Sequence, residues 1–429
     1  MVFSRIKRIF GRQRAFNLKA VYSGLLPNPL SVKTTPTIER IDPNLLEQVY
    51  IESPLVFNAI NKTVQIIMST EYHLEGDEKT VSFFEDFLAS IGYRGGERDW
   101  ESLLDAIFKY QCIYGCAPVE LIYAKKSNEI VDLDIIDPKK FDYARDASFR
   151  IALDEFGNPL GYVQTLPAAA AVENKIKPPP GVQLMSNQIF FPPERIAHFK
   201  LYTVGDGFYG IGLIEPIYKT FIRLKASEEG FANASYRCGF PLVIAKIGDE
   251  NHDPTPEHIK NALEDLKDIN SRYAFAAPYY NDLKILEPKH PEKIRTYLDY
   301  YIEQIVTGMG LPKAFATGAG ETTNRATLAR QEYITKLTLK DIIKKTTKII
   351  ESKIFYRVAE LHNKAHPNDR IGVPKMVWGE IALEELDSKC QRIVNYARAG
   401  LLHPDSAIDE WIRKTEKLPP KPRTNVETD

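Results

Sequence analysis

The sequence predicts an α+β fold. Apolar residues recur at helical spacing from about residue 54 to 114, alternate as in strands from about 119 to 201, and return to helical spacing from about 213. Strands and helices therefore fall in separate stretches of the chain, which is typical of α+β proteins.

Length and composition are those of a folded protein whose net charge is close to zero. The chain has 429 residues, 44% of them hydrophobic, and its 56 basic and 57 acidic residues give a net charge of -1. This balance gives no global attraction to nucleic acid or anionic lipid, so such a partner must meet a local patch. The four scattered cysteines do not predict a disulfide scaffold and fit a reducing compartment. No apolar run approaches the ~20 residues of a membrane-spanning helix.

Residues 1–44 are predicted to be a basic N-terminal arm and linker. The start of the chain is rich in Lys and Arg with no acid before Glu39, and its apolar residues predict a short amphipathic helix. Such a segment can lie on a membrane surface, act as a transit peptide, dock on an acidic partner or stay flexible. Prolines between 27 and 43 predict an extended linker.

Helices are expected first after the linker. Ser53 caps and Pro54 opens a helix whose apolar stripe reaches Met68. Two more helices are predicted over about 79–91 and 100–114. Strand patterns follow at 119–123, 130–136, 149–153, 160–165, 189–191 and 196–201. Gly157-Asn158 predicts a turn among them, and the Pro- and Ala-rich stretch 166–187 an irregular excursion.

In the second half, two helices bracket a small α/β insert. They are expected over 213–237 and 291–307, and the second has a clear apolar stripe. The insert is expected to hold strands over 242–247, 273–277 and 283–286 and a helix over 256–269. After a Gly/Thr-rich loop, a helical pattern covers about 324–363, which at ~60 Å is expected to be kinked or broken. A strand near 375–379 and short helices over about 383–398 and 405–416 complete the pattern.

The sequence contains few residues in arrangements that favour a catalytic or metal-binding role. Asp132 and Asp134 share one face of a strand and, with Asp137, could hold Mg²⁺ for phosphoryl transfer. Alternation of Asp with apolar residues is also typical of a half-exposed strand, and we favour that interpretation. Cys112 and Cys116 have no second ligand pair nearby in sequence and are interpreted as core residues.

Histidines form one pair at ligand spacing on a helix, His362 and His366, and Pro367 ends that helix. The Gly/Thr-rich loop lacks the Gly-Lys-Ser/Thr ending of a phosphate-binding loop. The sequence thus predicts no catalytic constellation, no metal and no cofactor.

Basic residues concentrate between Lys313 and Lys353, a segment that contains nine Lys or Arg and four Asp or Glu. This segment is the strongest candidate for contact with a polyanion. The alternative is a solvated helix face that pairs with acidic neighbours. Since the loop 317–323 has no aromatic residue for stacking on bases, DNA contact there would be to the backbone and without sequence specificity.

Two segments, with the order of the elements, resemble a known family. The first is His198–Lys200 followed by Asp206–Pro216 (DGFYGIGLIEP), and the second is Gly310–Phe315 with the Gly/Thr loop and Asn324–Gln331. Together they resemble the portal protein of tailed double-stranded DNA viruses, the head-to-tail connector family. The basic N-terminal helix and the stretch 400–418 are also similar to portal proteins, and the resemblance covers about 45–418.

The resemblance implies a portal-type fold. It comprises an α/β wing, a two-helix stem, a small α/β clip, a long kinked wing helix after a tunnel loop, and a short helical crown. The implied ranges are 1–44 for the arm and linker, 45–212 and 325–380 for the wing, 213–240 and 291–309 for the stem, 241–290 for the clip, 310–324 for the tunnel loop, 381–418 for the crown and 419–429 for the Pro-rich tail.

The resemblance also implies a structural, non-enzymatic function. The subunits would form a ring, of about twelve copies, that is the channel for DNA packaging and ejection at one vertex of the virion, assembled in the host cytoplasm. The implied partners are other copies of the chain, double-stranded DNA passing non-specifically, the terminase large subunit, the major capsid or scaffold protein and a neck adaptor protein, with no membrane partner.

Two sets of site residues follow from this mapping. The residues expected to face DNA in the tunnel loop and the next helix are Lys313, Thr317, Gly318, Gly320, Thr322, Thr323, Asn324, Arg325 and Arg330. The clip acids expected to face the motor or neck proteins are Asp249, Glu250, Asp253 and Glu257.

Two other functions stand as alternatives. One is a metal-dependent enzyme acting on nucleic acid or nucleotides through Asp132, Asp134 and Asp137. The other is a membrane-surface scaffold anchored by residues 1–14.

Overall fold

The computed structural model describes most of the chain from residue 40 onward. The described residues are 40–92, 99–124, 128–167, 176–205, 207–239, 242–246, 255–257, 260, 282–286, 291–312, 325–381, 386–401, 409 and 412–413. The chain divides into two units, 1–41 and 42–429, and every element below belongs to the second. The predicted N-terminal helix, the strand 273–277 and most of the predicted helices over 256–269 and 405–416 lie outside the described residues.

Four helices open the second unit, and each begins at a side-chain cap. They are α3 (Pro43–Glu52), α4 (Pro54–Met68), α5 (Glu78–Ser90) and α6 (Trp100–Tyr114). The side chain of each cap accepts a hydrogen bond from a backbone N–H of the first turn, which the helix itself leaves unpaired: Asp42, Ser53, Asp77 and Asp99. The predicted helices from Pro54, 79 and 100 are confirmed, whereas α3 was not predicted.

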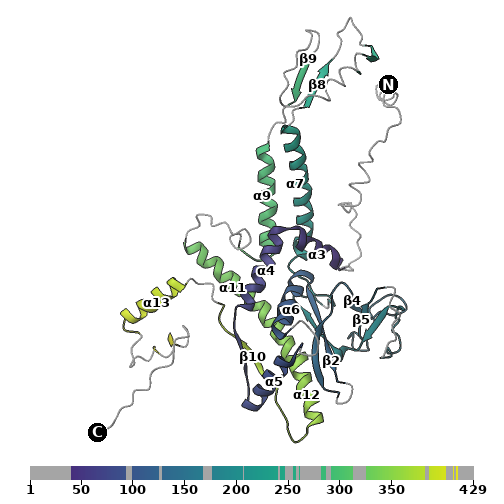
Figure 1. The fold of residues 1–429 in the computed structure, drawn as a ribbon, viewed down its shortest axis with the longest axis vertical. Coiled ribbons are helices and arrows are strands. Elements are labelled where there is room, and N and C mark those ends of the chain that lie inside the picture. Colours follow the sequence, from purple (N-terminus) through teal and green to yellow (C-terminus); the bar gives the residue numbers. More distant parts are fainter. Residues whose placement is uncertain are drawn as a thin grey trace. The chain divides into compact units, whose positions relative to one another are not determined.

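The described strands form four small antiparallel sheets (Figure 1). In the first, β2 (Cys116–Tyr123) lies between β3 (Ile130–Ile135) and β7 (Ile196–Lys200), and α6 packs against it. The others are β4 (Phe141–Tyr143) with β5 (Tyr162–Thr165) and β6 (Gln188–Phe191), β1 (Tyr72–Glu75) with β10 (Lys375–Trp378), and β8 (Leu242–Lys246) with β9 (Asp282–Leu286).

The predicted strand over 149–153 is wrong. Ile151 and Leu153 form isolated bridges there instead of a continuous ladder. The cause is local, because the carboxylate of Asp146 accepts from the backbone N–H groups of Ser148 at 2.8 Å and Arg150 at 2.9 Å, and Phe149 between them is left-handed with φ 59°. Side-chain acceptors of this kind compete with strand pairing and favour turns. The predicted turn at Gly157-Asn158 is confirmed, with Gly157 at φ 82°.

The core lies between α6, the first sheet and the long helical run of the second half. Ile107, Phe108 and Cys112 of α6 are fully buried. Burial raises the pKa of the Cys112 thiol to about 12. A thiol that stays protonated is neither a nucleophile nor a ready metal ligand, which agrees with a core role for this cysteine.

Helices α7 (Tyr218–Gly239) and α9 (Pro291–Gly308) pack side by side, and in sequence they bracket β8 and β9 (Figure 1). Helix α7 begins at Tyr218 rather than at 213, after a 3₁₀ turn, η2 (Glu215–Ile217). Pro216 accounts for the difference, because proline has no N–H to donate within a helix. The predicted strands 242–247 and 283–286 and the predicted helix 291–307 are confirmed.

A helical run continues from Arg325 to Ala365 with one change of pitch. It consists of α11 (Arg325–Ile349), a π-helical segment η3 (Ile350–Phe355) and α12 (Tyr356–Ala365). The expected break thus takes the form of a π segment within one rod. The run is tied to α6 by a hydrogen bond of 2.8 Å from Thr346 Oγ1 to Gln111 Oε1.

Helix α13 (Leu386–Arg398) follows β10, as the pattern over 383–398 predicts. Within the part of the chain that the structure describes, no helix is both long enough and apolar enough to cross a membrane.

Candidate functional site

The described part of the segment with the first resemblance, 207–216, packs against the turn between α6 and β2. A Cβ atom on Gly210 would lie 2.0 Å from the carbonyl oxygen of Gly115, and one on Gly212 would lie 2.7 Å from the Gly115 nitrogen. Only residues without a Cβ allow two backbones to approach this closely. We call these three residues the glycine junction. Because the N–H of Leu213 donates to the carbonyl of Cys112 at 2.8 Å, the junction sets where the chain enters α7.

Side chains from the second sheet hold the other half of the same segment. The hydroxyl of Tyr143 donates to the carbonyl of Phe208 at 2.7 Å, and that of Tyr209 donates to Asp142 Oδ1 at 2.5 Å. Arg145 donates to the other oxygen, Oδ2, at 2.9 Å, and this hydrogen bond raises the pKa of the guanidinium. Sequence reasoning missed this cluster, because Asp142 lies on a strand that was not predicted and is 67 residues from Tyr209.

The helix pair is anchored where α9 returns to the body. A Cβ on Gly308 would lie 2.5 Å from Cγ2 of Ile217, so the two segments are in close contact. Ile305 of α9 is fully buried, and Lys225 of α7 forms an ion pair with Glu52 of α3. Part of the predicted apolar stripe remains uncovered, since Tyr297 is 64% exposed.

Most of the residues expected to face DNA lie outside the described part of the chain. These are Lys313, Thr317, Gly318, Gly320, Thr322, Thr323 and Asn324. Arg325 is the first residue of α11, and Arg330 is exposed on the same helix. The structure therefore places two of the nine residues on one element.

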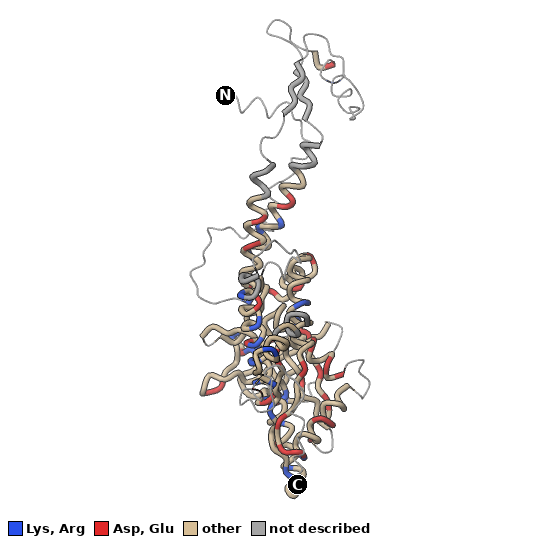
Figure 2. The backbone as a smooth tube through the Cα atoms, turned by 90° about the vertical axis from the view of Figure 1, so that its left-hand side faces the viewer, with Lys and Arg blue, Asp and Glu red and all other residues tan. Residues whose placement is uncertain are grey.

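The basic segment includes an exposed lysine face on α11. Lys340, Lys344 and Lys348 are exposed at intervals of four residues and so share one side of the helix. Lys345 points elsewhere, because it pairs with Asp341 at 2.5 Å and lies 4.0 Å from the centre of the Tyr202 ring. Figure 2 shows the positions of Lys and Arg along the backbone of the described body, interspersed with those of Asp and Glu. Pairing with an acidic neighbour thus holds for Lys345, and contact of the exposed lysines with a polyanion stays a prediction.

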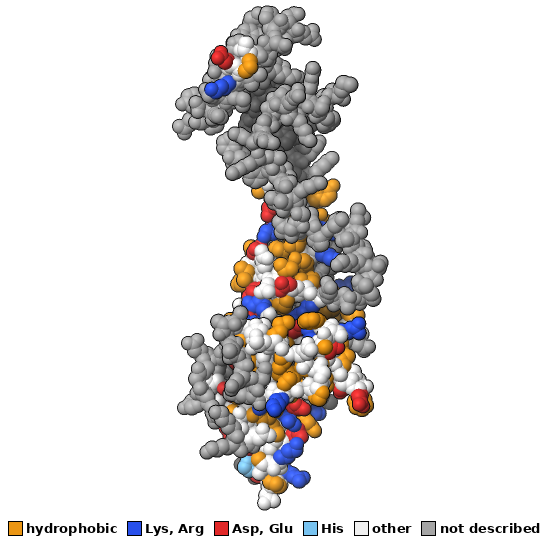
Figure 3. Space-filling model, turned by 90° about the vertical axis from the view of Figure 1, so that its right-hand side faces the viewer, with side chains coloured by type: hydrophobic (Ala, Val, Ile, Leu, Met, Phe, Trp, Pro, Cys, Tyr) orange, Lys and Arg blue, Asp and Glu red, His pale blue; other side chains and the backbone are white. Residues whose placement is uncertain are grey.

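Apolar side chains are exposed on the N-terminal half of α11. Tyr333, Ile334 and Leu337 are 62%, 50% and 50% exposed and lie within about one turn of each other. We call them the α11 patch. Figure 3 shows one face of the molecule, on which hydrophobic side chains also reach the surface over the described helix pair and body. Grouped exposed apolar residues are typical of surfaces that contact another protein.

The predicted clip acids are mostly outside the described residues. Asp249, Glu250 and Asp253 are not described, and Glu257 is exposed in a short helical turn. Their predicted role therefore stays a prediction.

The three aspartates of the enzyme alternative do not form a metal group. Asp132 Oδ1 accepts from the N–H groups of Gly92 and Leu133, and Asp134 Oδ1 accepts from that of Ile135. Asp137 lies 3.8 Å from the Lys139 ammonium. Among the described residues, the group able to gather three metal ligands is a different one, Glu129 with His362 and His366. Sequence spacing showed the two histidines but gave no signal for Glu129, which is distant in the chain.

Comparison with protein families decides between the hypotheses. The sequence model of the family described as the portal protein of Mu bacteriophage matches residues 44–418, most of the chain. The chain belongs to this portal protein family. The predicted relationship to portal proteins of tailed viruses is thereby confirmed, and the enzyme alternative is not supported. The curated protein sequences contain no match to this portal protein.

Solved structures with the same fold come from gene transfer agent (GTA) particles. The virion of the native GTA particle contains a chain with a TM-score of 0.57 and 14% identity, covering 89% of this portal protein and 94% of that chain. The neck of the empty particle, computed with C6 symmetry, gives 0.58 and 14% over 89% and 95%. The neck of the native particle, computed with C12 symmetry, gives 0.56 and 13% over 88% and 93%. At these identities the likeness shows a shared fold.

Proposed function

We propose that this portal protein forms a ring of about twelve identical subunits around a DNA channel at one vertex of a virion. The family match over residues 44–418 carries the proposal. It is supported by the fold shared with neck structures computed with C12 and C6 symmetry. A ring requires contacts between two different faces of each subunit that close by rotation. The α11 patch, and the hydrophobic side chains on the face drawn in Figure 3, offer such surfaces.

The parts of the ring follow from the order of elements. In this proposal α7 and α9 are the stem, and β8 and β9 belong to the clip, 241–290. The wing comprises 45–212 and 325–380, the tunnel loop is 310–324, and α13 belongs to the crown, 381–418. Residues 1–44 are the arm and linker and 419–429 the tail.

The partners are those that a packaging channel needs. DNA passes without sequence-specific contact, the clip with Glu257 meets the terminase large subunit and later a neck adaptor, and the outer surface meets the major capsid or scaffold protein. Assembly takes place in the host cytoplasm. The family is one of structural proteins, and no catalytic step is assigned to any residue.

Electron microscopy of the purified full chain, with its mass from light scattering, tests the ring. The expected result is rings with a central hole and a mass near twelve times 48.8 kDa. A uniform monomer at micromolar concentration would contradict the proposal.

Charge reversal at the tunnel loop tests the DNA channel. Lys313→Glu and Arg325→Glu are expected to reduce DNA packaging or retention several-fold while rings still form, because they replace attraction to phosphate by repulsion. Packaged DNA is measured by nuclease protection and ring formation by microscopy. Lys140→Glu, at an exposed position of the wing, is the matched control and should leave packaging unchanged. If these variants fail to form rings, the segment contributes to assembly and its assignment as the tunnel loop is wrong.

A further inference from the structure

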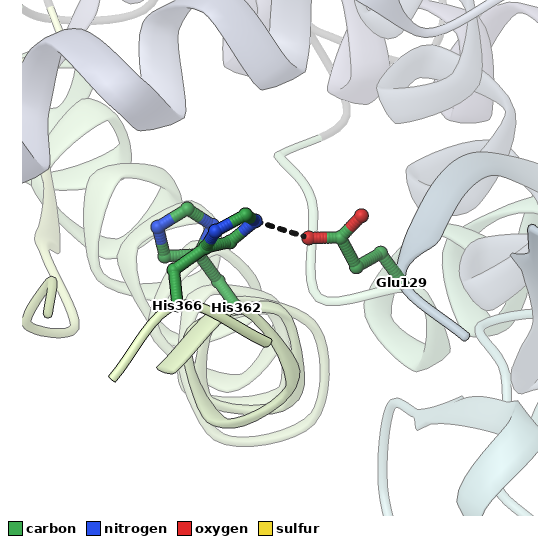
Figure 4. A group of neighbouring side chains, drawn as sticks. All are labelled: Glu129, His362 and His366. Carbon is green, nitrogen blue, oxygen red and sulfur yellow. Dashed lines mark ion pairs between the residues drawn. The ribbon is translucent and has the colours of Figure 1, made fainter. Parts of the chain in front are cut away.

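The end of α12 and the connection between β2 and β3 bring together two imidazoles and a carboxylate. Glu129, His362 and His366 each offer one ligand atom, and these atoms lie within 4.8 Å of one another. Figure 4 shows the two rings side by side at the helix end and the carboxylate facing them. We propose that this His–His–Glu cluster binds a divalent transition-metal ion, with zinc the best match.

Local structure places each side chain. His362 lies in the last turn of α12, and His366 is the residue that caps the helix, its N–H donating to the His362 carbonyl at 2.8 Å, so the two rings lie beside each other with centres 4.8 Å apart. Glu129 follows Asn128, which adopts a left-handed conformation with φ 57°. This turn is closed by hydrogen bonds from the N–H of Ala124 to the Glu129 carbonyl at 2.8 Å and from that of Asn128 to the Ala124 carbonyl at 3.2 Å. The turn presents Glu129 toward the end of α12.

The distances fit a metal centre after small side-chain movements. Bonds from zinc to nitrogen or oxygen are about 2.0–2.2 Å, so two ligands of a tetrahedral ion lie about 3.3–3.5 Å apart. His366 Nε2 and Glu129 Oε1 are 3.3 Å apart, which matches this separation. Both side chains are partly exposed, so they have room to close on an ion and to admit it from solvent.

His362 is oriented before any metal binds. Its side chain is 13% exposed, and its ring lies 4.6 Å from that of Phe83, centre to centre. Its Nε2 is 3.2 Å from the carbonyl oxygen of Asp369. In the tautomer that donates a hydrogen bond there, Nδ1 carries the lone pair that a metal requires. Metal-bound histidines commonly make this second contact, because it fixes the ring and increases the basicity of the ligand.

The chemistry of the three groups selects the kind of ion. Imidazole suits Zn²⁺, Ni²⁺ and Cu²⁺, whereas Mg²⁺ and Ca²⁺ prefer all-oxygen sites. The carboxylate of Asp369 is already paired with Lys79 at 2.5 Å, so water is the expected fourth ligand. A bound ion would connect the end of α12 to the β2–β3 connection, two parts of the wing that are far apart in sequence.

Zinc binding to the full-length protein, stripped with a chelator and dialysed, tests the site. The wild type is expected to bind one more Zn²⁺ per chain than the variants Glu129→Gln and His366→Asn. Each variant should weaken zinc affinity at that site at least tenfold. Zinc should also raise the thermal midpoint of the wild type but not of the variants, since a ligand that binds only the native state stabilises it.

His73→Asn is the matched control. His73 Nε2 also lies 3.3 Å from a glutamate, Glu75, and both side chains are exposed, but among the described residues no third ligand joins them. This variant should bind zinc as the wild type does. Circular dichroism checks that all variants are folded. Because His366 is exposed, its substitution should not disturb the fold. Equal zinc affinity in the wild type and both cluster variants would show that Glu129 and His366 form an ion pair only, and would overturn the proposal.

Discussion

Gly210→Ala is expected to destabilise the portal subunit by about 3–5 kcal/mol, in the range of severe core substitutions. The new Cβ would lie 2.0 Å from the carbonyl oxygen of Gly115, and this neighbour is backbone that cannot rotate away. The glycine junction would have to open, with loss of the hydrogen bond from Leu213 to Cys112. Since native domains are stable by about 5–15 kcal/mol, we expect poor yield or a thermal midpoint lowered by roughly 5–15 °C.

Gly230→Ala is the matched control for this substitution. Gly230 lies within α7, and a Cβ there would meet no atom within 4 Å. Alanine is the better helix former, so this variant should be stabilised by up to about 1 kcal/mol. Thermal unfolding followed by circular dichroism measures both changes. Similar midpoints for the two variants would show that the junction is not as tight as the structure has it.

The double substitution Tyr333→Asp with Leu337→Asp is expected to prevent ring assembly and leave a folded monomer. Both side chains belong to the α11 patch and are at least half exposed, so the isolated subunit should tolerate the change. If the patch is covered by the next subunit, each contact would bury two unpaired carboxylates, at a cost of several kcal/mol. The fraction of protein in rings, measured by light scattering and microscopy, should fall at least tenfold.

An exposed apolar residue elsewhere gives the control. Phe156 is 89% exposed in the turn after Asp154, and Phe156→Asp should assemble as the wild type does. Rings of normal mass from the α11 double variant would show that α11 does not form the contact between subunits. They would leave the family relationship unaffected.

Sequence reasoning located the elements whose signals are local. The cap at Ser53, the helix from about residue 100 and the turn at Gly157 are each encoded within a few residues, and the structure has them where they were expected or within a residue or two. The resemblance in 206–216 was also found from the sequence. The sequence did not show why glycine is needed there. Gly210 and Gly212 lie against the backbone of Gly115, about 95 residues earlier, and a Cβ on either would clash with it.

Features that depend on distant partners were not predictable. Strand β10 was predicted from its own residues, but its partner β1, a strand of four residues some 300 positions earlier, was not. Glu129 is an ordinary acid in sequence and gains meaning only beside His362 and His366. The net charge of the basic segment was evident from the sequence. Only the fold shows that Lys345 is paired with Asp341 while other lysines of the segment are exposed.

The π segment η3 determines the direction in which the side chains of α12 point around the helix axis. An α-helix advances about 100° per residue, so the side on which a residue emerges depends on counting from the start of the rod. A π turn holds an extra residue and resets that count. If all six residues of Ile350–Phe355 took regular α pitch, α12 would rotate by about 100° and His362 and His366 would turn away from Glu129, whereas deletion of one of the six would cancel that rotation. Lys340, Lys344 and Lys348 precede the segment and would keep their direction, so η3 sets the phase between two faces of one rod.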